Sequence, residues 1–401
     1  MPRNPSINHS EWLLKLFYFL YFAAAASLLP FLVLFYEQRG LTGRQIGLLA
    51  AIPPLITLFA ATFWSGLADA TQRHHRLLGL AIFGAMALAL AIFFASTFPV
   101  LVITVTAFAF FAAPIIPLVD NSSLEYLGAQ KKQYGKLRLW GAVGWGVAAP
   151  VVGQLVERLG LGWSFYGYGL FMLAGLVISC RLPIRHARID QSFWQGVRLL
   201  LVDQRWWSFL ALIFIAGMGS GLILNYLFLY MEQLGASKTL MGLALTVGTL
   251  SELVVFSSSD RLLDRWGTRT LLMLALVALV VRSLAYALVQ NPWLVLPIQL
   301  LHGLSFAALW AAGVAYAHKL APAGLGATAQ GLFAGVLMGL ATAVGAFIGG
   351  ILYENVGLSL MYGWTGIGIL VALLCLMRIM PNQEEEIISR EFSEETENER
   401  Y

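Results

Sequence analysis

The chain has 401 residues, of which 59% are hydrophobic and 11% are charged, and its mean hydropathy is +0.76. Soluble domains are roughly half apolar and a quarter charged, so this composition excludes an ordinary soluble protein and predicts that most of the surface faces lipid. Two cysteines, Cys180 and Cys375, exclude a cystine-stapled secreted domain.

Apolar runs separated by charged or Gly/Pro-containing breaks predict an all-α integral membrane protein with twelve spans, because a span needs about 20 residues. The first run is too long for the apolar part of a signal peptide, so it is interpreted as a retained helix. The predicted spans are 12–36, 45–68, 77–95, 98–120, 137–157, 162–182, 206–231, 239–260, 270–289, 293–316, 327–352 and 358–378.

The distribution of Lys and Arg predicts the orientation of these spans. One side carries 20 basic residues, and the other carries four, Arg39, Arg44, Arg158 and Lys238. The richer side is expected to be cytoplasmic, which places both termini in the cytoplasm and predicts a multi-pass protein of the cell membrane. Both cysteines then lie on the reducing side, where a disulfide is not expected.

A repeat at a shift of 195 to 197 residues indicates two homologous six-helix halves. Glu37-Gln38-x-Gly40 aligns with Glu232-Gln233-x-Gly235, and Gly153-x-Leu155-x-Glu157 aligns with Gly350-x-Leu352-x-Glu354. Six helices per repeat keep both halves in the same orientation, which is a parallel repeat about an axis along the membrane normal. The predicted organisation is a half at 1–182, a cytoplasmic linker at 183–205, a half at 206–378 and a tail at 379–401.

The tail holds eight Glu and two Arg, a net charge of −6 against +4 for the whole chain. Such a block is typical of a solvated, disordered segment, and a partner-binding role is the alternative.

Acidic and basic residues recur in the loops after the second and eighth predicted spans. A carboxylate at a helix end that faces arginines forms a charge-assisted contact, which can break when two halves move. Ordinary loop charge with a capping Asp is the alternative interpretation. The residues of this predicted loop latch are Asp69, Arg73, Asp264, Arg265 and Arg269.

Three ionisable residues fall inside consecutive spans of the second half: Glu252, Arg282 and His302. Each lies roughly 14 to 20 Å into its helix at 1.5 Å per residue, near the middle of the bilayer core. Ionisable groups at this depth are costly and indicate function. Glu252 and Arg282 are predicted to form an ion pair that protonation of Glu252 would weaken, and His302 adds a group that titrates near neutrality. A static ion pair with a structural His is the alternative.

The first half contributes Asp120 at the end of its fourth span, after Pro114 and Pro117, and Arg138 and Trp145 in its fifth. Arg138 and Trp145 are seven residues apart and therefore share a helix face. An Arg binds a carboxylate or a hydroxyl pair, and an indole stacks on a ring. The alternatives are a continuation of the basic loop for Arg138 and packing against lipid for Trp145.

The run from Tyr134 to Gly146 resembles the fifth helix of the lactose permease group of the major facilitator superfamily, and more closely that of the phenylpropionate permease branch. Pro114-x-x-Pro117-Leu118-x-Asp120, Ser251-Glu252, Arg282 and Gln299-x-x-His302 are similar as well. The resemblance implies that Asp120, Arg138 and Trp145 bind the solute, and that Arg282 and His302 serve solute binding and proton coupling. Two positions depart from lactose permease, since its essential carboxylates align with Thr249 and Ser305. Glu252 is then the expected proton carrier, and lactose is not the expected solute.

The sequence therefore predicts a monomeric, proton-coupled symporter that imports a small organic solute, such as an aromatic carboxylate, a nucleoside or a sugar. The proton is the expected coupling ion, and no other cofactor, metal or nucleic-acid partner is expected. The chain lacks a nucleotide-binding phosphate loop and a nucleophile–base pair, so an enzyme is not predicted. Two alternatives are a proton-driven exporter of drug-like compounds and a non-transporting receptor or scaffold.

Overall fold

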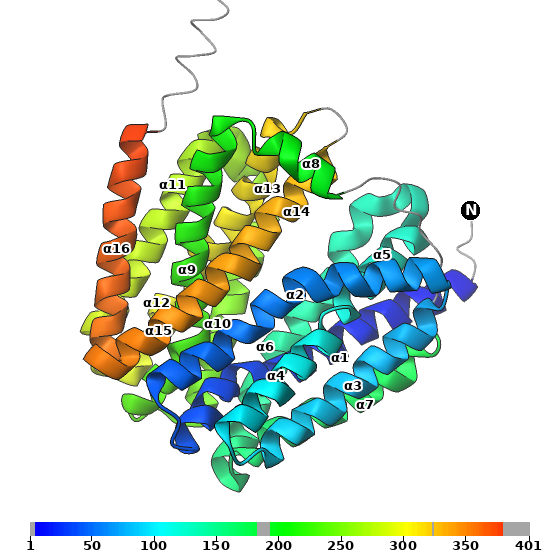
Figure 1. Ribbon diagram of the computed structural model, residues 1–401, viewed down its shortest axis with the longest axis horizontal. Helices are drawn as coiled ribbons and strands as arrows, with labels where there is room; N and C mark the ends of the chain where they lie inside the picture. Colours follow the sequence, from blue (N-terminus) through cyan, green and yellow to red (C-terminus); the bar gives the residue numbers. More distant parts are fainter. Residues whose placement is uncertain (1–4, 183–192, 323–324, 380–401) are drawn as a thin grey trace, which may run out of the picture.

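The computed structural model describes residues 5–182, 193–322 and 325–379, and every regular element within these ranges is a helix. The elements before residue 183 are α1 (Pro5–Gln38), α2 (Gly43–Thr71), α3 (His74–Phe94), α4 (Phe98–Ala112), α5 (Ile115–Leu127), the 3₁₀ helix η1 (Gly128–Gln133), α6 (Tyr134–Leu159) and α7 (Gly162–Ser179). We call this group the first half (Figure 1).

The later elements begin with α8, a short helix in the segment predicted as a linker. The second half consists of the elements that follow α8. The elements after residue 192 are α8 (Phe193–Leu200), α9 (Gln204–Gln233), α10 (Lys238–Ser257), α11 (Ser259–Leu288), η2 (Pro292–Leu294), α12 (Val295–Gln299), the π-helix η3 (Gly303–Ala307), α13 (Ala308–Leu320), α14 (Gly326–Ala334), the π-helix η4 (Gly335–Ala341), α15 (Thr342–Val356) and α16 (Leu358–Ile379).

Within the described ranges, eleven helices are long and apolar enough to cross a membrane. The bent pair formed by Pro292–Gln299 and Gly303–Leu320, whose axes differ by 43°, passes the same test when taken together and, counted as one span, brings the number to twelve. The prediction of an all-α fold with twelve spans is confirmed. The acidic tail from residue 380 onward lies outside the described residues, and its role stays a prediction.

The fourth span differs from its prediction. It runs from Phe98 to Leu127, so Asp120 lies inside α5 and not at a helix end. The span is interrupted at Pro114, which has no N–H and therefore leaves the carbonyl of Phe110 without its helical donor. The indole Nε1 of Trp64 donates to that carbonyl at 3.0 Å, so a side chain of α2 replaces the missing bond.

The repeat seen in the sequence recurs as repeated local geometry. Gly40 and Gly235 both have positive φ, of 75° and 77°, in equivalent turns. Thr42 and Ser237 then cap α2 and α10 by accepting a hydrogen bond from the backbone N–H three residues later. These caps satisfy amides that a helix N-terminus leaves unpaired. The equivalent turns lie at one end of the molecule, which we call the loop end.

The two halves meet along α2 with α15 and along α6 with α10. At the loop end this contact is between backbones. A Cβ on Gly350 would collide with the carbonyl oxygen of Gly43, and a Cβ on Gly153 would collide with that of Lys238. The absence of side chains at these two repeat-related glycines lets the helices approach closely.

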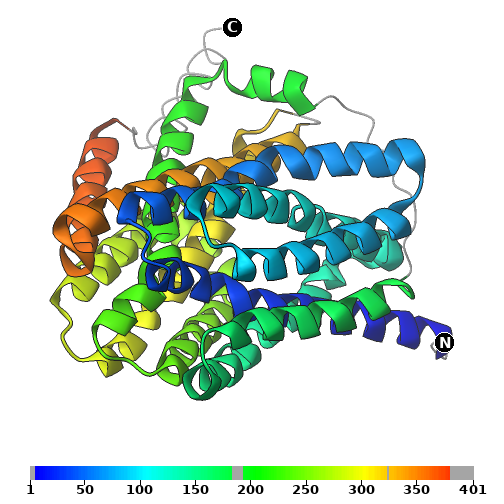
Figure 2. The ribbon, with the colours of Figure 1, turned by 60° about the horizontal axis from the view of Figure 1, so that its bottom comes forward.

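Figures 1 and 2 show α2 and α15 side by side near the loop end. In Figure 1 the ribbons of the two halves diverge toward the opposite end, where α8 and α5 lie. The backbone contacts described above therefore join the halves at the loop end, and we call the opposite end the linker end.

Candidate functional site

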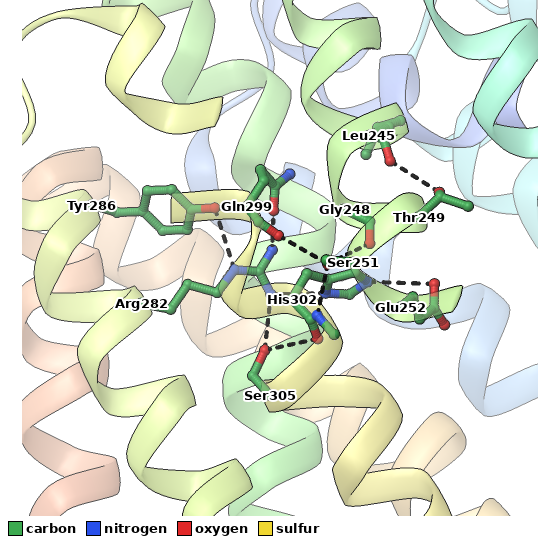
Figure 3. Close-up of polar contacts among 11 residues, drawn as sticks. Leu245, Gly248, Thr249, Ser251, Glu252, Arg282, Tyr286, Gln299, His302 and Ser305 are labelled. Atoms are coloured by element: carbon green, nitrogen blue, oxygen red, sulfur yellow. Dashed lines mark hydrogen bonds and ion pairs between the residues drawn. The ribbon is translucent and has the colours of Figure 1, made fainter. Parts of the chain in front are cut away.

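Arg282 is the buried charge around which the second half builds its polar cluster. Its side chain is 4% exposed and projects from α11 (Figure 3). The guanidinium donates to Gln299 Oε1 at 2.5 Å, to the hydroxyl of Tyr286 at 3.3 Å and to His302 Nδ1 at 3.0 Å. Arg stays protonated in proteins, so this buried positive charge is permanent and is solvated by neutral groups.

The predicted direct ion pair between Glu252 and Arg282 is wrong. Among the described residues, Arg282 has no carboxylate within 4.0 Å, and His302 lies between the two groups. His302 Nε2 is 3.9 Å from Glu252 Oε2, while its other ring nitrogen contacts Arg282 (Figure 3). The polar contacts thus run from Glu252 to His302 to Arg282.

The contact with Arg282 assigns the protons of His302. An Arg can only donate, so Nδ1 must accept, and a neutral imidazole then carries its proton on Nε2. That N–H faces the carboxylate of Glu252, but 3.9 Å is too long for a hydrogen bond. Glu252 forms no hydrogen bond with any residue in the described ranges, and its side chain is 22% exposed. It is therefore the member of the cluster that is least tied to protein partners.

The imidazole of His302 is held in place by its surroundings. It stacks on Phe306, with ring centroids 5.4 Å apart and planes 9° apart. Gly248 of α10 lies beneath the ring, where a Cβ would be 3.3 Å from His302 Cδ2. The π-helix η3 starts at the next residue, and π-helical turns are frequent at functional sites.

In the first half, Asp120 is bound by tyrosines. The hydroxyl of the fully buried Tyr18 donates to Asp120 Oδ1 at 2.7 Å, and Tyr134 hydrogen-bonds the same carboxylate. Asp120 and Arg138 form no direct ion pair, although both lie next to Tyr18, whose ring centroid is 5.6 Å from the guanidinium carbon of Arg138. The structure thus brings these two predicted residues around one tyrosine.

Arg138 differs from Arg282 in its partners. Its guanidinium lies over the ring of Phe22, 4.2 Å from the centroid, and it forms no hydrogen bond or ion pair with any described residue. Arg138 also lies close enough to Glu252 of the other half for a Coulomb interaction. A guanidinium on an aromatic face keeps its N–H donors available for a further acceptor.

Trp145 is half-buried on α6. The next residue, Gly146, accepts a hydrogen bond of 2.7 Å from Thr246 Oγ1 of α10. Trp145 therefore lies where the halves touch, on the helix that faces the helix of Glu252. The structure thus brings Asp120 and Arg138 together around Tyr18, and Glu252, His302 and Arg282 together in the other half, while no contact of Trp145 within the described ranges joins it to another predicted site residue.

The predicted loop latch remains a prediction. The side chain of Asp69 lies outside the described residues. Asp264 and Arg265 form no ion pair with any described residue, and Arg73 lies between α2 and α3. Gly267, with φ of 73°, interrupts α11 between Arg265 and Arg269.

Two other carboxylates join the halves, at the loop end. Glu354 Oε2 accepts a hydrogen bond from the backbone N–H of Arg44 at 2.8 Å. Glu157 Oε2 accepts from the backbone N–H and from Oγ1 of Thr239, at 3.2 and 2.7 Å. Each carboxylate thus binds the N-terminus of a helix in the opposite half, where the helix dipole favours negative charge. The sequence identified the repeat that contains these residues but not their contacts.

Several residues of the two clusters were missed by the sequence analysis. Tyr286 lies four residues after Arg282, on the same helix face, and this spacing could have identified it. Tyr18 and Phe22 also share a face, but nothing in an apolar run marks which aromatic side chain meets Arg138. No group of three or more His, Cys, Asp or Glu in the described ranges could hold a metal ion.

Comparison with known proteins identifies the fold and the family. The model of the MFS_1 like family matches residues 11–364. The chain belongs to the MFS_1 like family. It is 31% identical to the maltose permease of Geobacillus stearothermophilus over 377 residues, 92% of this chain and 95% of the relative. It is 27% identical to the probable 3-phenylpropionic acid transporter of Escherichia coli strain K12 over 359 residues, 88% of this chain and 93% of the relative.

Among solved structures, the crystal structure of the nucleoside transporter NupG (D323A mutant) is similar with a TM-score of 0.84. The two are 17% identical, and the match covers 93% of this chain and 100% of the other, so it shows a shared fold. As a member of the MFS_1 like family, the chain is a multi-pass membrane transporter of the permease type and not an enzyme. The resemblance to the major facilitator superfamily and to its phenylpropionate permease branch is confirmed.

Proposed function

We propose that the chain is a proton-coupled symporter of the cell membrane that imports a small organic solute by alternating access. The observation that carries this proposal is the order of contacts Glu252, His302, Arg282 beside the junction of the two halves. It supports a role for Glu252 as the proton carrier, because the other two members are held by neighbouring groups and Glu252 is not.

The charge balance of this cluster supports coupling. With Glu252 ionised, its charge offsets one arginine; with Glu252 protonated, both Arg282 and Arg138 are left without that carboxylate. Arg282 keeps its bonds to Gln299 and Tyr286 in either case. Arg138 has no such bonds with the described residues, so protonation of Glu252 leaves it as the cation that most needs an acceptor.

Arg138 and Trp145 supply the chemistry for solute binding. The free guanidinium can bind a carboxylate or a pair of hydroxyls with two parallel hydrogen bonds, and the indole can stack on a ring. These two recognition modes agree with an aromatic carboxylate and with a sugar, the solutes that the names of the two relatives suggest. Asp120, which is bound by Tyr18 and Tyr134, would help to position the guanidinium of Arg138 through the shared neighbour Tyr18.

The arrangement of the halves suggests which way this conformation faces. With both termini in the cytoplasm, the loop end lies outside and the linker end inside. The halves are in backbone contact at the loop end, so this conformation would close the outer side. The predicted latch residues lie toward the linker end, where they would meet in the alternative conformation.

The proposal is tested with purified protein in lightly buffered liposomes that contain a pH-sensitive dye. Maltose and 3-phenylpropionate are added outside, one at a time, and protein-free liposomes correct for passive entry of the acid. We expect internal acidification with one of the two solutes. Glu252→Gln should abolish this acidification and uphill uptake while sparing the exchange of labelled for unlabelled solute.

The matched control is Glu11→Gln, which removes a carboxylate paired with Lys15 on its own helix, at 2.7 Å. This variant should behave as the unaltered protein. Uphill uptake that persists in Glu252→Gln would show that Glu252 is not the carrier. Proton efflux on addition of solute would identify an exporter, and solute binding without any proton movement would exclude coupling.

A further inference from the structure

The bend in the tenth span coincides with an interrupted backbone hydrogen bond. In a regular helix the N–H of Gly303 would bond the carbonyl of Gln299, four residues earlier. Here Gly303 N donates instead to Ser251 Oγ of α10 at 2.9 Å, and the same oxygen lies 3.3 Å from the carbonyl oxygen of Gln299. A side chain inserted into the helical ladder is a recognised cause of a sharp kink.

The hydroxyl of Ser251 therefore replaces the backbone carbonyl that would accept from Gly303 N–H in a regular helix. Its proton has an acceptor on its own helix, the carbonyl of Gly248, at 2.7 Å. Its oxygen accepts from Gly303. No Cβ could be accommodated at Gly303, since it would collide with the carbonyl oxygen of Ser251 and lie 3.0 Å from the backbone N of Glu252. The two backbones thus touch at this point.

This junction is adjacent in sequence to the two groups of the proposed coupling site. Ser251 precedes Glu252, and Gly303 follows His302, so one hydrogen bond ties the backbones that carry the carboxylate and the imidazole (Figure 3). We infer that Ser251 is a positioning residue that fixes the bend of the tenth span and, through it, the separation of Glu252 and His302.

The inference rests on the proposed function of Glu252 as proton carrier, but it makes a distinct physical claim. Without the hydroxyl, Gly303 N–H has no acceptor in an apolar region, and the helix regains a bond only by closing the break toward Gln299. Closing the break moves His302. The charged and titratable groups that face Glu252 are His302, Arg282 and Arg138, and the first of these would change its distance.

The test uses the rate at which a hydrophobic carbodiimide modifies Glu252 in the full-length protein, measured by mass spectrometry across a range of pH. Carbodiimides react with protonated carboxyl groups, so the profile reports the protonated fraction without requiring a known solute. We expect Ser251→Ala and Ser251→Cys to displace the profile, changing the rate at a fixed pH at least about threefold, as half a pH unit does. Ser251→Thr keeps the hydroxyl and should retain the original profile.

The matched control is Ser283→Ala, which removes a fully buried hydroxyl next to Arg282 whose one hydrogen bond within the described ranges goes to Leu279 O of its own helix, at 2.8 Å. It should leave the profile unchanged. Profiles of Ser251→Ala and Ser251→Cys that superimpose on the original would overturn the inference, as would a Ser251→Thr profile displaced like that of Ser251→Ala. Failure of the proposed function is seen separately, as uphill uptake that persists in Glu252→Gln.

Discussion

The two carboxylates that join the halves at the loop end are expected to stabilise this conformation. Glu354 binds the N-terminus of α2, and Glu157 binds the N-terminus of α10. Each is four residues after the glycine that allows the close backbone contact of its helix, Gly350 or Gly153. We predict that Glu157→Gln together with Glu354→Gln shifts the protein toward the conformation in which the loop end is open.

The magnitude follows from the charge that each substitution removes. A carboxylate at an exposed helix N-terminus contributes about 0.3 to 1 kcal/mol, and Gln keeps an acceptor oxygen but loses the charge, so each change should cost about 0.5 kcal/mol. The two sites lie on different helix pairs, so their effects should add. A total of about 1 kcal/mol changes the ratio of the two conformations about fivefold.

The ratio can be measured with spin labels on exposed loop-end positions of opposite halves, Leu159→Cys and Asn355→Cys. Cys180 and Cys375 are first replaced by Ser. Double electron–electron resonance then gives the populations of the short and the long distance between the two labels. An unchanged ratio in the variant with both Gln substitutions would refute the reasoning, as would an equal shift caused by the control Glu11→Gln.

Three further predictions concern topology and packing. An impermeant maleimide should label Cys180 and Cys375, both exposed, in inside-out vesicles but not in intact cells; the reverse would contradict the predicted orientation. Arg282→Lys replaces a planar guanidinium by a single ammonium group and should lower the free energy of unfolding by about 2 kcal/mol. The measurement is the thermal unfolding midpoint in detergent, and an unchanged midpoint would contradict the hydrogen bonds described for Arg282. Gly303→Ala should destabilise the protein by about 1 to 3 kcal/mol because its Cβ meets the backbone of α10. Gly169→Ala, which meets nothing within 4 Å, should leave the midpoint unchanged or raise it.

The spans could be predicted because each is set by a local property, the length of an apolar run. The length of an apolar run does not predict where a helix ends when the helix continues beyond the apolar region. The fourth span was predicted to stop at Asp120 because the apolar run ends at this charged residue, yet the helix continues to Leu127. A helix satisfies its own backbone and needs apolar side chains only inside the bilayer, so hydropathy gives the span and not the helix end.

The candidate site was predicted in part for a related reason. Charged residues in apolar runs are rare enough to identify Glu252, Arg282 and His302 individually. Their order of contact depends on how the helices are rotated and where the tenth span bends. Opposite charge favours a Glu252–Arg282 pair, but Gln299 and Tyr286 bind the guanidinium from its other sides. A prediction that pairs residues only by their charge overlooks neutral acceptors such as Gln299 and Tyr286.

The corrected order changes how protonation can act. If Glu252 were paired directly with Arg282, its protonation would free Arg282, whose other bonds hold it within the second half. With His302 between them, Arg282 has no direct ion pair with Glu252 and senses the loss of the negative charge only as a longer-range Coulomb interaction. Arg138 of the first half also interacts with Glu252 and has no bonded partner among the described residues. Under the proposed function, protonation of Glu252 would weaken an attraction between the two halves and leave Arg138 available to a solute, which is the linkage between proton, solute and movement of the halves that symport requires.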